Sequence, residues 1–227
     1  MTKKEADRKF NKTIEDIKKI KIQGARNIAK AAVKAYFLWP SQRSKKILLN
    51  SRPTEPMMEN VLDMVEDYSE KEILSHFDKS QEKINQFVLK LIKNGDRVFT
   101  HCHSTNVSNA LTYAHKKGKR FEVYSTETRP LFQGRITAKE LRKAGIKVTM
   151  FVDSSFSMAI GKENKKDKNY ATKVFIGADA LVVLHHLDAL FGGAHAEAAT
   201  GQHLLRAHAL AHLGVPLDAA DVVAVVL

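Results

Sequence analysis

The sequence predicts an α/β fold in which a helical amino-terminal domain, residues 1–94, precedes a parallel-sheet domain, residues 95–180. Apolar residues recur at helical spacing before the turn signal Asn94-Gly95-Asp96, whereas short apolar runs alternate with helix-length segments after it. The composition then changes abruptly after residue 180. Residues 181–227 are therefore expected to form an incomplete or atypical ending.

The amino-terminal segment shows helical periods in three places. Residues 13–36 carry a helical apolar period that is interrupted at Gln23-Gly24-Ala25, which predicts two helices joined by a glycine turn. A further helix is expected from Thr54 to about Val65. Another is expected over residues 80–93, where apolar residues recur at spacings of one, three and four: Ile84, Phe87, Val88, Leu91 and Ile92.

Beyond Asp96 the pattern is typical of alternating strands and helices. Strands are expected at residues 98–100, 121–125, 147–152 and 174–176, and helices at 107–117 and 137–144. Strands separated by helix-length connections pair in parallel through right-handed crossovers. The sequence therefore predicts a Rossmann-like sheet.

Polar residues follow each expected strand and should share one edge of that sheet. They are His101-Cys102-His103, Thr126-Glu127-Thr128-Arg129, Asp153-Ser154-Ser155 and Gly177-Ala178-Asp179. Ligands of open α/β sheets bind at the carboxyl ends of the strands. Each cluster alone is compatible with an ordinary turn, but the four together indicate an active site.

Cys102 is the only cysteine of the chain, so no disulfide forms within it. It lies at a strand-to-helix turn, where the amides of a helix start favour anions and stabilise a thiolate. His101 and His103 are candidates to strengthen that effect. The alternative is a buried, chemically inert cysteine that packs as a small apolar residue.

The charge is strongly basic and uneven. The net charge is +12, and residues 1–50 carry 14 Lys and Arg against 4 Asp and Glu. No aromatic platform accompanies the cations, so we expect no nucleic-acid binding, and the charge suits a small phosphorylated substrate. No apolar run reaches the roughly 20 residues of a membrane helix. One cysteine and a charged start lead us to expect a cytoplasmic protein with no membrane role.

Several motifs together resemble one superfamily. They are Arg52-Pro53-Thr54, THCHS at 100–104, TETRPLFQGRITAKEL at 126–141, Val152-Asp153-Ser154 and Gly177-Ala178-Asp179. The superfamily holds ribose-1,5-bisphosphate isomerase, methylthioribose-1-phosphate isomerase and the regulatory subunits of translation initiation factor 2B. The resemblance covers about residues 13–180, and the ribose-1,5-bisphosphate isomerase branch fits best.

The resemblance implies roles for individual residues. Cys102 matches the catalytic cysteine of the isomerases, and Asp179 matches their catalytic aspartate. The expected substrate-binding residues are Gly24, Ala25, Arg52, Arg129, Gln133 and Gly134, with His101, His103, Glu127 and Asp153 in support. The arginines and Gln133 would bind phosphate, and Gly134 would let the backbone come close. Isomerases usually carry Arg where this chain has Gln23, and Arg26 is a candidate substitute.

The implied reaction converts ribose 1,5-bisphosphate to ribulose 1,5-bisphosphate. An aldose-to-ketose conversion moves one proton from C2 to C1 and rearranges protons among the oxygens. Cys102 would carry the carbon-bound proton and Asp179 the oxygen-bound protons, each contributing about 10²- to 10⁴-fold. The resemblance implies no cofactor. It also implies that AMP is a candidate activator and that the reaction belongs to nucleotide salvage.

A non-catalytic regulatory subunit is the alternative reading. Such a protein would bind nucleotide or sugar phosphate in the same cleft and pass the signal to a partner. The initiation-factor alpha subunit typically carries Ala at the cysteine position and Glu where this chain has Asp179. The Cys102 and Asp179 pair therefore favours the enzyme. For Asp179, the structural alternative is a helix cap after a strand.

The chain departs from the family pattern after Asp179. The usual Asn-Lys-x-Gly-Thr segment, which contacts substrate, is not found there. This departure favours the regulatory alternative or an inactive product. Family members assemble through their carboxyl-terminal half into dimers or hexamers. Because that half is altered here, we expect impaired or changed assembly.

Residues 181–227 differ in composition from the rest. They hold no Lys and a single Arg206, but six of the ten His. A shifted reading frame, a fusion or a divergent ending would each produce such a change. Residues 194–213 have a helix-favouring composition, so a helix is expected there. The histidines lack a Glu-x-x-His partner or a cysteine, and we expect no metal site.

Overall fold

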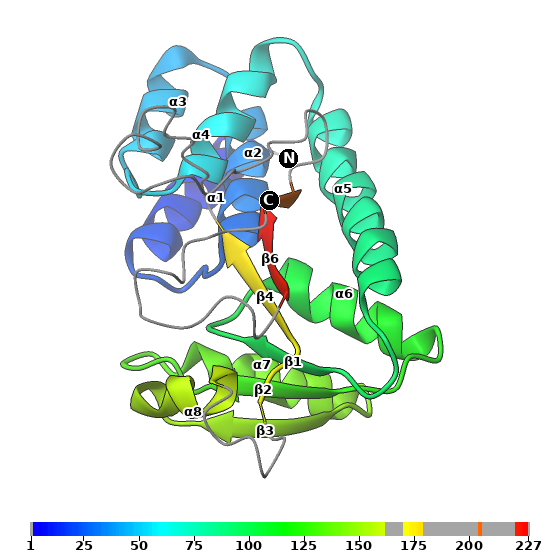
Figure 1. The fold of residues 1–227 in the computed structure, drawn as a ribbon. Coiled ribbons are helices and arrows are strands. Elements are labelled where there is room, and N and C mark those ends of the chain that lie inside the picture. The colour runs from blue at the N-terminus through cyan, green and yellow to red at the C-terminus, as the bar shows by residue number, and fades with distance from the viewer. Residues whose placement is uncertain (1, 162–169, 179–203, 206–220, 227) are drawn as a thin grey trace, which may run out of the picture. The chain divides into compact units, whose positions relative to one another are not determined.

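The computed structural model describes residues 2–161, 170–178, 204–205 and 221–226. The chain divides into two compact units, Met1–Glu82 and Lys83–Leu227. Figure 1 shows the helices of the first unit and the sheet of the second. The expected α/β class, with helices preceding a Rossmann-like parallel sheet, is confirmed.

All the elements that the structure describes in the first unit are helices. Its elements are α1 (Lys3–Lys18), α2 (Ala25–Leu38), α3 (Gln42–Leu49), α4 (Pro56–Asp63), the 3₁₀ turn η1 (Met64–Glu66) and the first part of α5 (Glu70–Leu91). The expected break near Gly24 is present, because Gly24 adopts φ +83° directly before α2. Its carbonyl accepts the first amide bonds of that helix, from Asn27 and Ile28.

Two helices begin earlier than their apolar periods predict, and serine or threonine caps explain both. Thr2 accepts a hydrogen bond from the amide of Glu5, whose side chain returns one to the Thr2 amide, so α1 starts at Lys3. Ser69 and Glu72 form the same reciprocal pair before α5. Ser41 caps α3, a helix that the apolar period alone did not predict. Capping side chains satisfy amides that a helix start leaves without partners.

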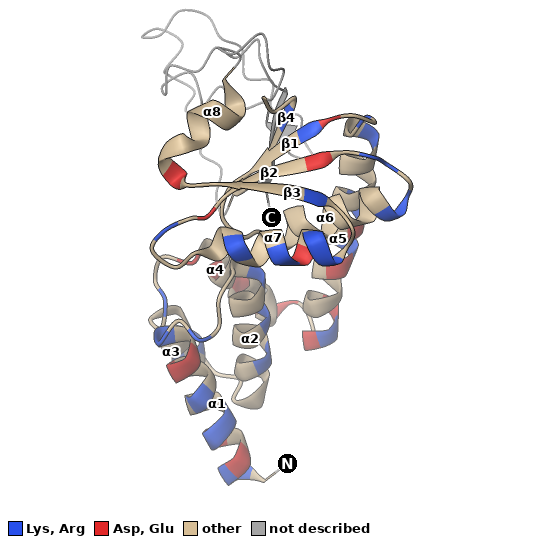
Figure 2. Cartoon of the chain, turned by 90° about the horizontal axis from the view of Figure 1, so that it is seen from below, with Lys and Arg blue, Asp and Glu red and all other residues tan. Residues whose placement is uncertain are grey.

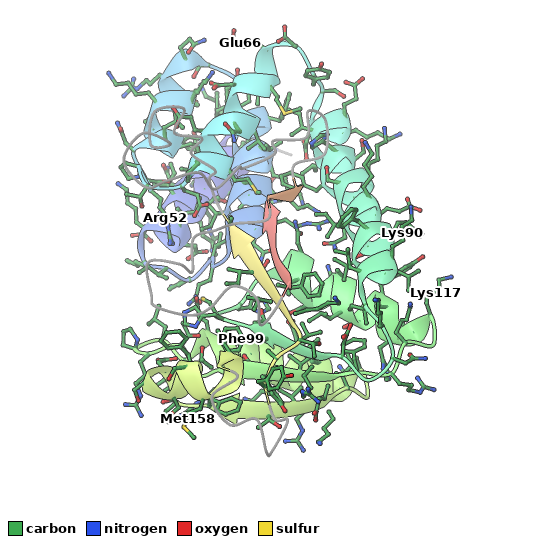
Figure 3. The ribbon with its side chains drawn as sticks, viewed as in Figure 1. Arg52, Glu66, Lys90, Phe99, Lys117 and Met158 are labelled. Carbon is green, nitrogen blue, oxygen red and sulfur yellow. The ribbon has the colours of Figure 1, made fainter. Side chains whose placement is uncertain are left out.

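The core of the first unit is apolar. Leu48, Met58 and Leu62 are fully buried there, together with Ile28 and Val33 of α2. These residues come from different helices, which explains why the helices pack as one cluster. Figure 3 labels Arg52, which follows α3 in this unit, among the side chains drawn as sticks.

The second unit is built on a sheet with strand order β3-β2-β1-β4-β6-β5. The strands are β1 (Arg97–Thr100), β2 (Glu122–Thr126), β3 (Lys147–Phe151), β4 (Lys173–Ala178), β5 (Leu204–Leu205) and β6 (Asp221–Val226). All neighbouring pairs are parallel except β5 with β6. The helices between them are α6 (Thr105–Lys116), α7 (Gln133–Lys143), the turn η2 (Asp153–Ser155) and α8 (Phe156–Ile160).

Alternate residues of each central strand face opposite sides of the sheet. Val98 and Val123 pack with α6, α7 and the end of α5, whereas Phe99 and Tyr124 pack with α8. Figure 2 shows α6 and α7 on one face of these strands and α8 on the other. Strand side chains that alternate between the two faces, with helices covering both faces, are typical of a parallel sheet. The loops therefore lie at the ends of the strands, between the two layers of helices.

After β4, the structure describes only the strands β5 and β6. The helix expected over 194–213 is not present at Leu204–Leu205, the two described residues of that range, because they pair antiparallel with β6. Pairing with a neighbouring strand overrides the weak helix preference of the composition. Among the described residues, no helix is both long and apolar enough to cross a bilayer.

Candidate active site

Cys102 lies in the loop between β1 and α6, in the left-handed backbone conformation with φ +62°. Its amide donates a hydrogen bond of 3.0 Å to Oγ1 of Thr128, in the loop after β2. Its carbonyl accepts one of 2.9 Å from Oγ1 of Thr137 on α7. The backbone of Cys102 is therefore held by both neighbouring segments.

The sulfur atom of Cys102 lies at the start of a second helix. Sγ is 2.9 Å from Oε1 of Gln133, the first residue of α7, and the thiol donates to that amide oxygen. Ser104, two residues after Cys102, caps α6 by accepting from the Val107 amide. Helix starts present amides and positive potential to anions. The half-buried thiol thus lies beside the first turn of α7.

The two histidines beside Cys102 are fixed through threonine hydroxyls. His103 Nδ1 lies 3.0 Å from Oγ1 of Thr137, which already donates its hydrogen to the Cys102 carbonyl. A hydroxyl has only one hydrogen to donate, so His103 donates through Nδ1. His101 Nδ1 lies 2.5 Å from Oγ1 of Thr126.

Asp153 joins the loop after β3 to the loop after β2. Its two carboxylate oxygens accept the amides of Thr128 and Arg129, each at 2.7 Å. The Arg129 amide, followed by those of Thr128 and the Thr126 hydroxyl, holds the pKa of Asp153 below its usual range. Asp153 is therefore ionised when it holds this loop.

Glu127 holds two arginines. Its oxygens lie 2.7 Å from Arg129 Nε and 2.9 Å from Arg135 on α7, and the carboxylate is almost completely buried. The hydrogen bond from Arg129, then that from Arg135, lowers the pKa of Glu127, and the same ion pair raises the pKa of Arg129. Both guanidinium groups also lie over the Phe132 ring. The group carries a net positive charge at the surface.

Two glycines mark close approaches at the strand ends. A Cβ on Gly134 would lie 1.8 Å from the carbonyl oxygen of Thr126, so α7 can approach β2 only with glycine there. This packing accounts for Gly134, and a substrate contact for it stays a prediction. A Cβ on Gly177 would lie 2.5 Å from Oγ of Ser104, so the end of β4 lies against the start of α6.

The sheet order places this cluster at a topological switch point. The chain runs from β1 outward to β2 and β3, and then returns to β4 on the other side of β1. In open α/β sheets the binding crevice lies where the strand order reverses in this way. Cys102 follows β1 and Gly177 is the last residue but one of β4, so both lie at this point.

The structure brings together the predicted residues of the second unit that it describes. His101, Cys102, His103, Glu127, Arg129, Gln133, Gly134 and Asp153 all lie in the loops and helix starts after β1, β2 and β3. Asp179 lies outside the described residues. No three His, Cys, Asp or Glu of the described segments gather as metal ligands would.

The remaining predicted residues belong to the first unit. Gly24 and Ala25 form the start of α2, and Arg52 lies 3.6 Å from Glu55. Arg26, the candidate substitute for a missing arginine, pairs with Asp78 at 2.7 Å and Gln81 at 3.0 Å. Arg26 therefore serves the packing of α2 on α5 within this unit.

Sequence reasoning gave no individual role to three residues that build the site. Thr128 and Thr137 hold the backbone of Cys102, and Arg135 shares the Glu127 carboxylate. Thr137 stands four residues after Gln133 on one helix face, a spacing that could have indicated its position. Thr128 was placed only as a member of the polar cluster after β2, and its bond to the Cys102 amide could not be predicted because it joins two loops that follow different strands.

Comparison with known proteins agrees with this fold. Residues 18–187 match the model of the initiation factor 2 subunit family. The chain belongs to this family. It is 32% identical over 192 residues to ribose 1,5-bisphosphate isomerase of Archaeoglobus fulgidus, covering 74% of this chain and 59% of that protein. The Thermococcus kodakarensis enzyme of the same name is 33% identical over 203 residues, with 74% and 61% covered. This member of the family thus spans about 60% of the length of these relatives.

Solved structures of the family show the same fold. Translation initiation factor 2B of Pyrococcus horikoshii superposes with a TM-score of 0.60 at 20% identity, covering 75% of this chain and 66% of that one. The delta subunit from Chaetomium thermophilum gives 0.60 at 19% identity, covering 76% of each. The predicted kinship to this superfamily is therefore confirmed.

Proposed function

We propose that this chain carries the catalytic centre of a sugar-phosphate isomerase that converts ribose 1,5-bisphosphate to ribulose 1,5-bisphosphate. One observation carries the proposal: the only cysteine is held at the switch point of the sheet, with its sulfur on the first residue of α7. Relatives that are about one-third identical bear the name of this enzyme. A thiol at a helix start suits the transfer of a carbon-bound proton.

The reaction needs two kinds of proton transfer. Opening the sugar ring at C1 places a proton on the ring oxygen, and forming the ketone removes the proton of the C2 hydroxyl. Between these events one proton leaves C2 and returns to C1. Cys102 as thiolate takes the proton from C2 and as thiol gives it to C1. Asp179, which follows β4, gives the proton to the ring oxygen and later takes that of the hydroxyl. Atoms and charge balance without a cofactor.

Cations around the thiol would bind the phosphates. Arg129 keeps its charge and is oriented by the buried Glu127, so its guanidinium is preorganised for an anion. The amides at the start of α7 add positive potential near Gln133. Gly24, Ala25 and Arg52 are proposed as substrate contacts supplied by the first unit. AMP is proposed as an activator.

The test is direct conversion by the purified chain. Ribose 1,5-bisphosphate is incubated with the protein, with and without AMP, and ribulose 1,5-bisphosphate is measured. We expect turnover that falls about 10²- to 10⁴-fold in Cys102→Ser and in Asp179→Asn. The matched controls are Met158→Ser, which removes an exposed sulfur, and Asp67→Asn, which removes an exposed carboxylate. Both controls should keep the parent rate.

Two outcomes would reject the proposal. A parent chain without turnover excludes catalysis by this protein, and a Cys102→Ser variant at the parent rate excludes the thiol as the proton carrier. The first outcome would favour the regulatory alternative, which is motivated by the missing Asn-Lys-x-Gly-Thr segment after Asp179. Saturable binding of sugar phosphate or nucleotide without turnover would then identify a binding subunit.

A further inference from the structure

Two residues of the site share an uncommon backbone conformation. Cys102 has φ +62° and Thr128 has φ +60°. The left-handed region costs free energy for residues with a side chain, and most of all for a β-branched residue such as threonine. Strained residues persist only where surrounding contacts determine them, and they cluster at functional sites.

These two strained residues hold one another. The Cys102 amide donates to the Thr128 hydroxyl at 3.0 Å, and the Thr128 amide donates to Asp153 at 2.7 Å. A second oxygen of the same carboxylate accepts the amide of Arg129. The contacts form a relay that runs from Asp153 through Thr128 to Cys102.

The relay crosses three adjacent parallel strands. Asp153 follows β3, Thr128 follows β2 and Cys102 follows β1. Because β2 and β3 pair in register up to Thr126 and Phe151, the ends of these strands are fixed relative to each other. A displacement of any one loop would therefore move the sulfur atom.

Position matters for the proposed chemistry. One sulfur must reach two neighbouring carbons in turn, and misplacement of a reacting group by about 1 Å can cost about 10²-fold in rate. The ionised state of Asp153, which its amide partners favour, keeps both of its bonds charge-assisted.

We infer that Thr128 and Asp153 are positioning residues that set the backbone conformation of Cys102 and thereby the place of its thiol. The inference rests on the proposed function for its catalytic consequence, but the positioning itself can be measured without turnover. Cys102 is the only cysteine, so alkylation by iodoacetamide reports this one thiol.

The test compares Thr128→Val with Thr128→Ser. Valine keeps the branched shape but cannot accept the Cys102 amide, whereas serine keeps the hydroxyl. In Thr128→Val we expect hydrogen exchange of the Cys102 amide to accelerate about fivefold. Alkylation should also accelerate about threefold or more, because a freed loop exposes the half-buried thiol. Thr128→Ser should stay within about twofold of the parent in both measurements.

The isomerase assay adds a separate readout. We expect kcat of Thr128→Val to fall about 10- to 100-fold with KM within about twofold, because substrate contacts remain while the thiol is misplaced. Thr149→Val is the matched control, since Thr149 is exposed on β3 and should change none of these values. If the parent shows no turnover, the isomerase proposal fails, and exchange and alkylation alone decide the positioning.

A second variant keeps the inference testable if Thr128→Val does not fold, as judged by circular dichroism. Asp153→Asn keeps the shape, but its side chain can accept only one of the two amides. It should accelerate exchange and alkylation in the same direction. A folded Thr128→Val or Asp153→Asn with parent-like exchange and alkylation would overturn the inference.

Discussion

The helical unit and the sheet unit differ in where they bury polar side chains. Among the described residues the helical unit buries four, Ser44, Ser51, Glu55 and Gln81, and the sheet unit buries eight. Five of those eight lie at the carboxyl end of a strand, directly after one or on α7: Thr100, Ser125, Thr126, Glu127 and Thr137. Burying polar groups is costly unless they are paired. This concentration of buried polar groups coincides with the candidate site at the carboxyl ends of the strands.

Charges in the helical unit are arranged differently. Its ion pairs include neighbours along one helix, such as Lys12 with Asp16 and Lys19 with Glu15, and Lys45 pairs across to Asp63. Figure 2 shows basic and acidic residues interleaved along α1. Surface ion pairs of this kind contribute little to stability. The stability of this unit therefore rests on its apolar core.

The largest expected effects come from removing one core leucine in each unit. Leu48→Ala in α3 and Leu141→Ala in α7 each delete a fully buried side chain, so each should lower the free energy of unfolding by about 2–5 kcal/mol. Only Leu141→Ala should also accelerate alkylation of Cys102, because α7 carries Gln133 and Thr137. Urea unfolding and alkylation under native conditions measure the two effects.

The exposed Leu131 provides the control for this pair. Leu131→Ala removes the same side chain from a surface position and should change the free energy of unfolding by no more than about 0.5 kcal/mol. Equal alkylation rates in Leu48→Ala and Leu141→Ala would show that the placement of the thiol does not depend on the packing of α7.

The comparison also explains what the sequence could predict. In the second unit β1 to β4 and the crossover helices α6 and α7 were predicted within a few residues, because Val98, Val123 and Phe175 mark a buried sheet with short apolar runs. The sequence predicted neither α8 nor β5 and β6. Among the helices before β1, the apolar period located α2 and the end of α5 but missed α3 and the starts of α1 and α5. Those features depend on Thr2, Ser41 and Ser69, which act by capping.

The polar residues that follow β1, β2 and β3 were predictable as a group, but the contacts between them were not. Polar clusters after strands placed Cys102, Arg129 and Asp153 at one edge, since parallel strands end together. The relay through Thr128 was not predictable, because it joins residues 25 and 26 positions apart through a left-handed loop conformation. Such contacts depend on tertiary structure, which no local pattern encodes.

A smaller effect is expected from acid, and it should distinguish the sheet unit. The pKa of Glu127 is lowered in the folded protein by Arg129 and then Arg135. Its contribution to stability is therefore complete above the unfolded pKa of about 4.3 and is lost as the pH falls through the lower folded value. Thermal midpoints measured from pH 6 to pH 3 should fall less steeply in Glu127→Gln than in the parent.

Glu59→Gln serves as the control for this pH series. Glu59 is exposed on α4 in the helical unit, so its replacement should leave the pH dependence of the midpoint unchanged. If Glu127→Gln follows the parent curve at every pH, the two arginines do not stabilise the fold through this carboxylate.

The smallest expected effect lies at a cap of the helical unit. Thr2→Ala removes the side chain that accepts the Glu5 amide, and should lower the free energy of unfolding by about 1 kcal/mol. Thr13→Ala makes the same change inside α1, where the hydroxyl bonds to the Lys9 carbonyl and alanine is the better helix former, so stability should stay equal or rise slightly. Urea unfolding measures whether each substitution lowers or raises the free energy of unfolding.

Alkylation of Cys102 should be unchanged in both variants, because these hydroxyls act within one helix, whereas the hydroxyl of Thr128 acts between strands. A loss of equal size in both would mean that Thr2 does not stabilise α1 as a cap.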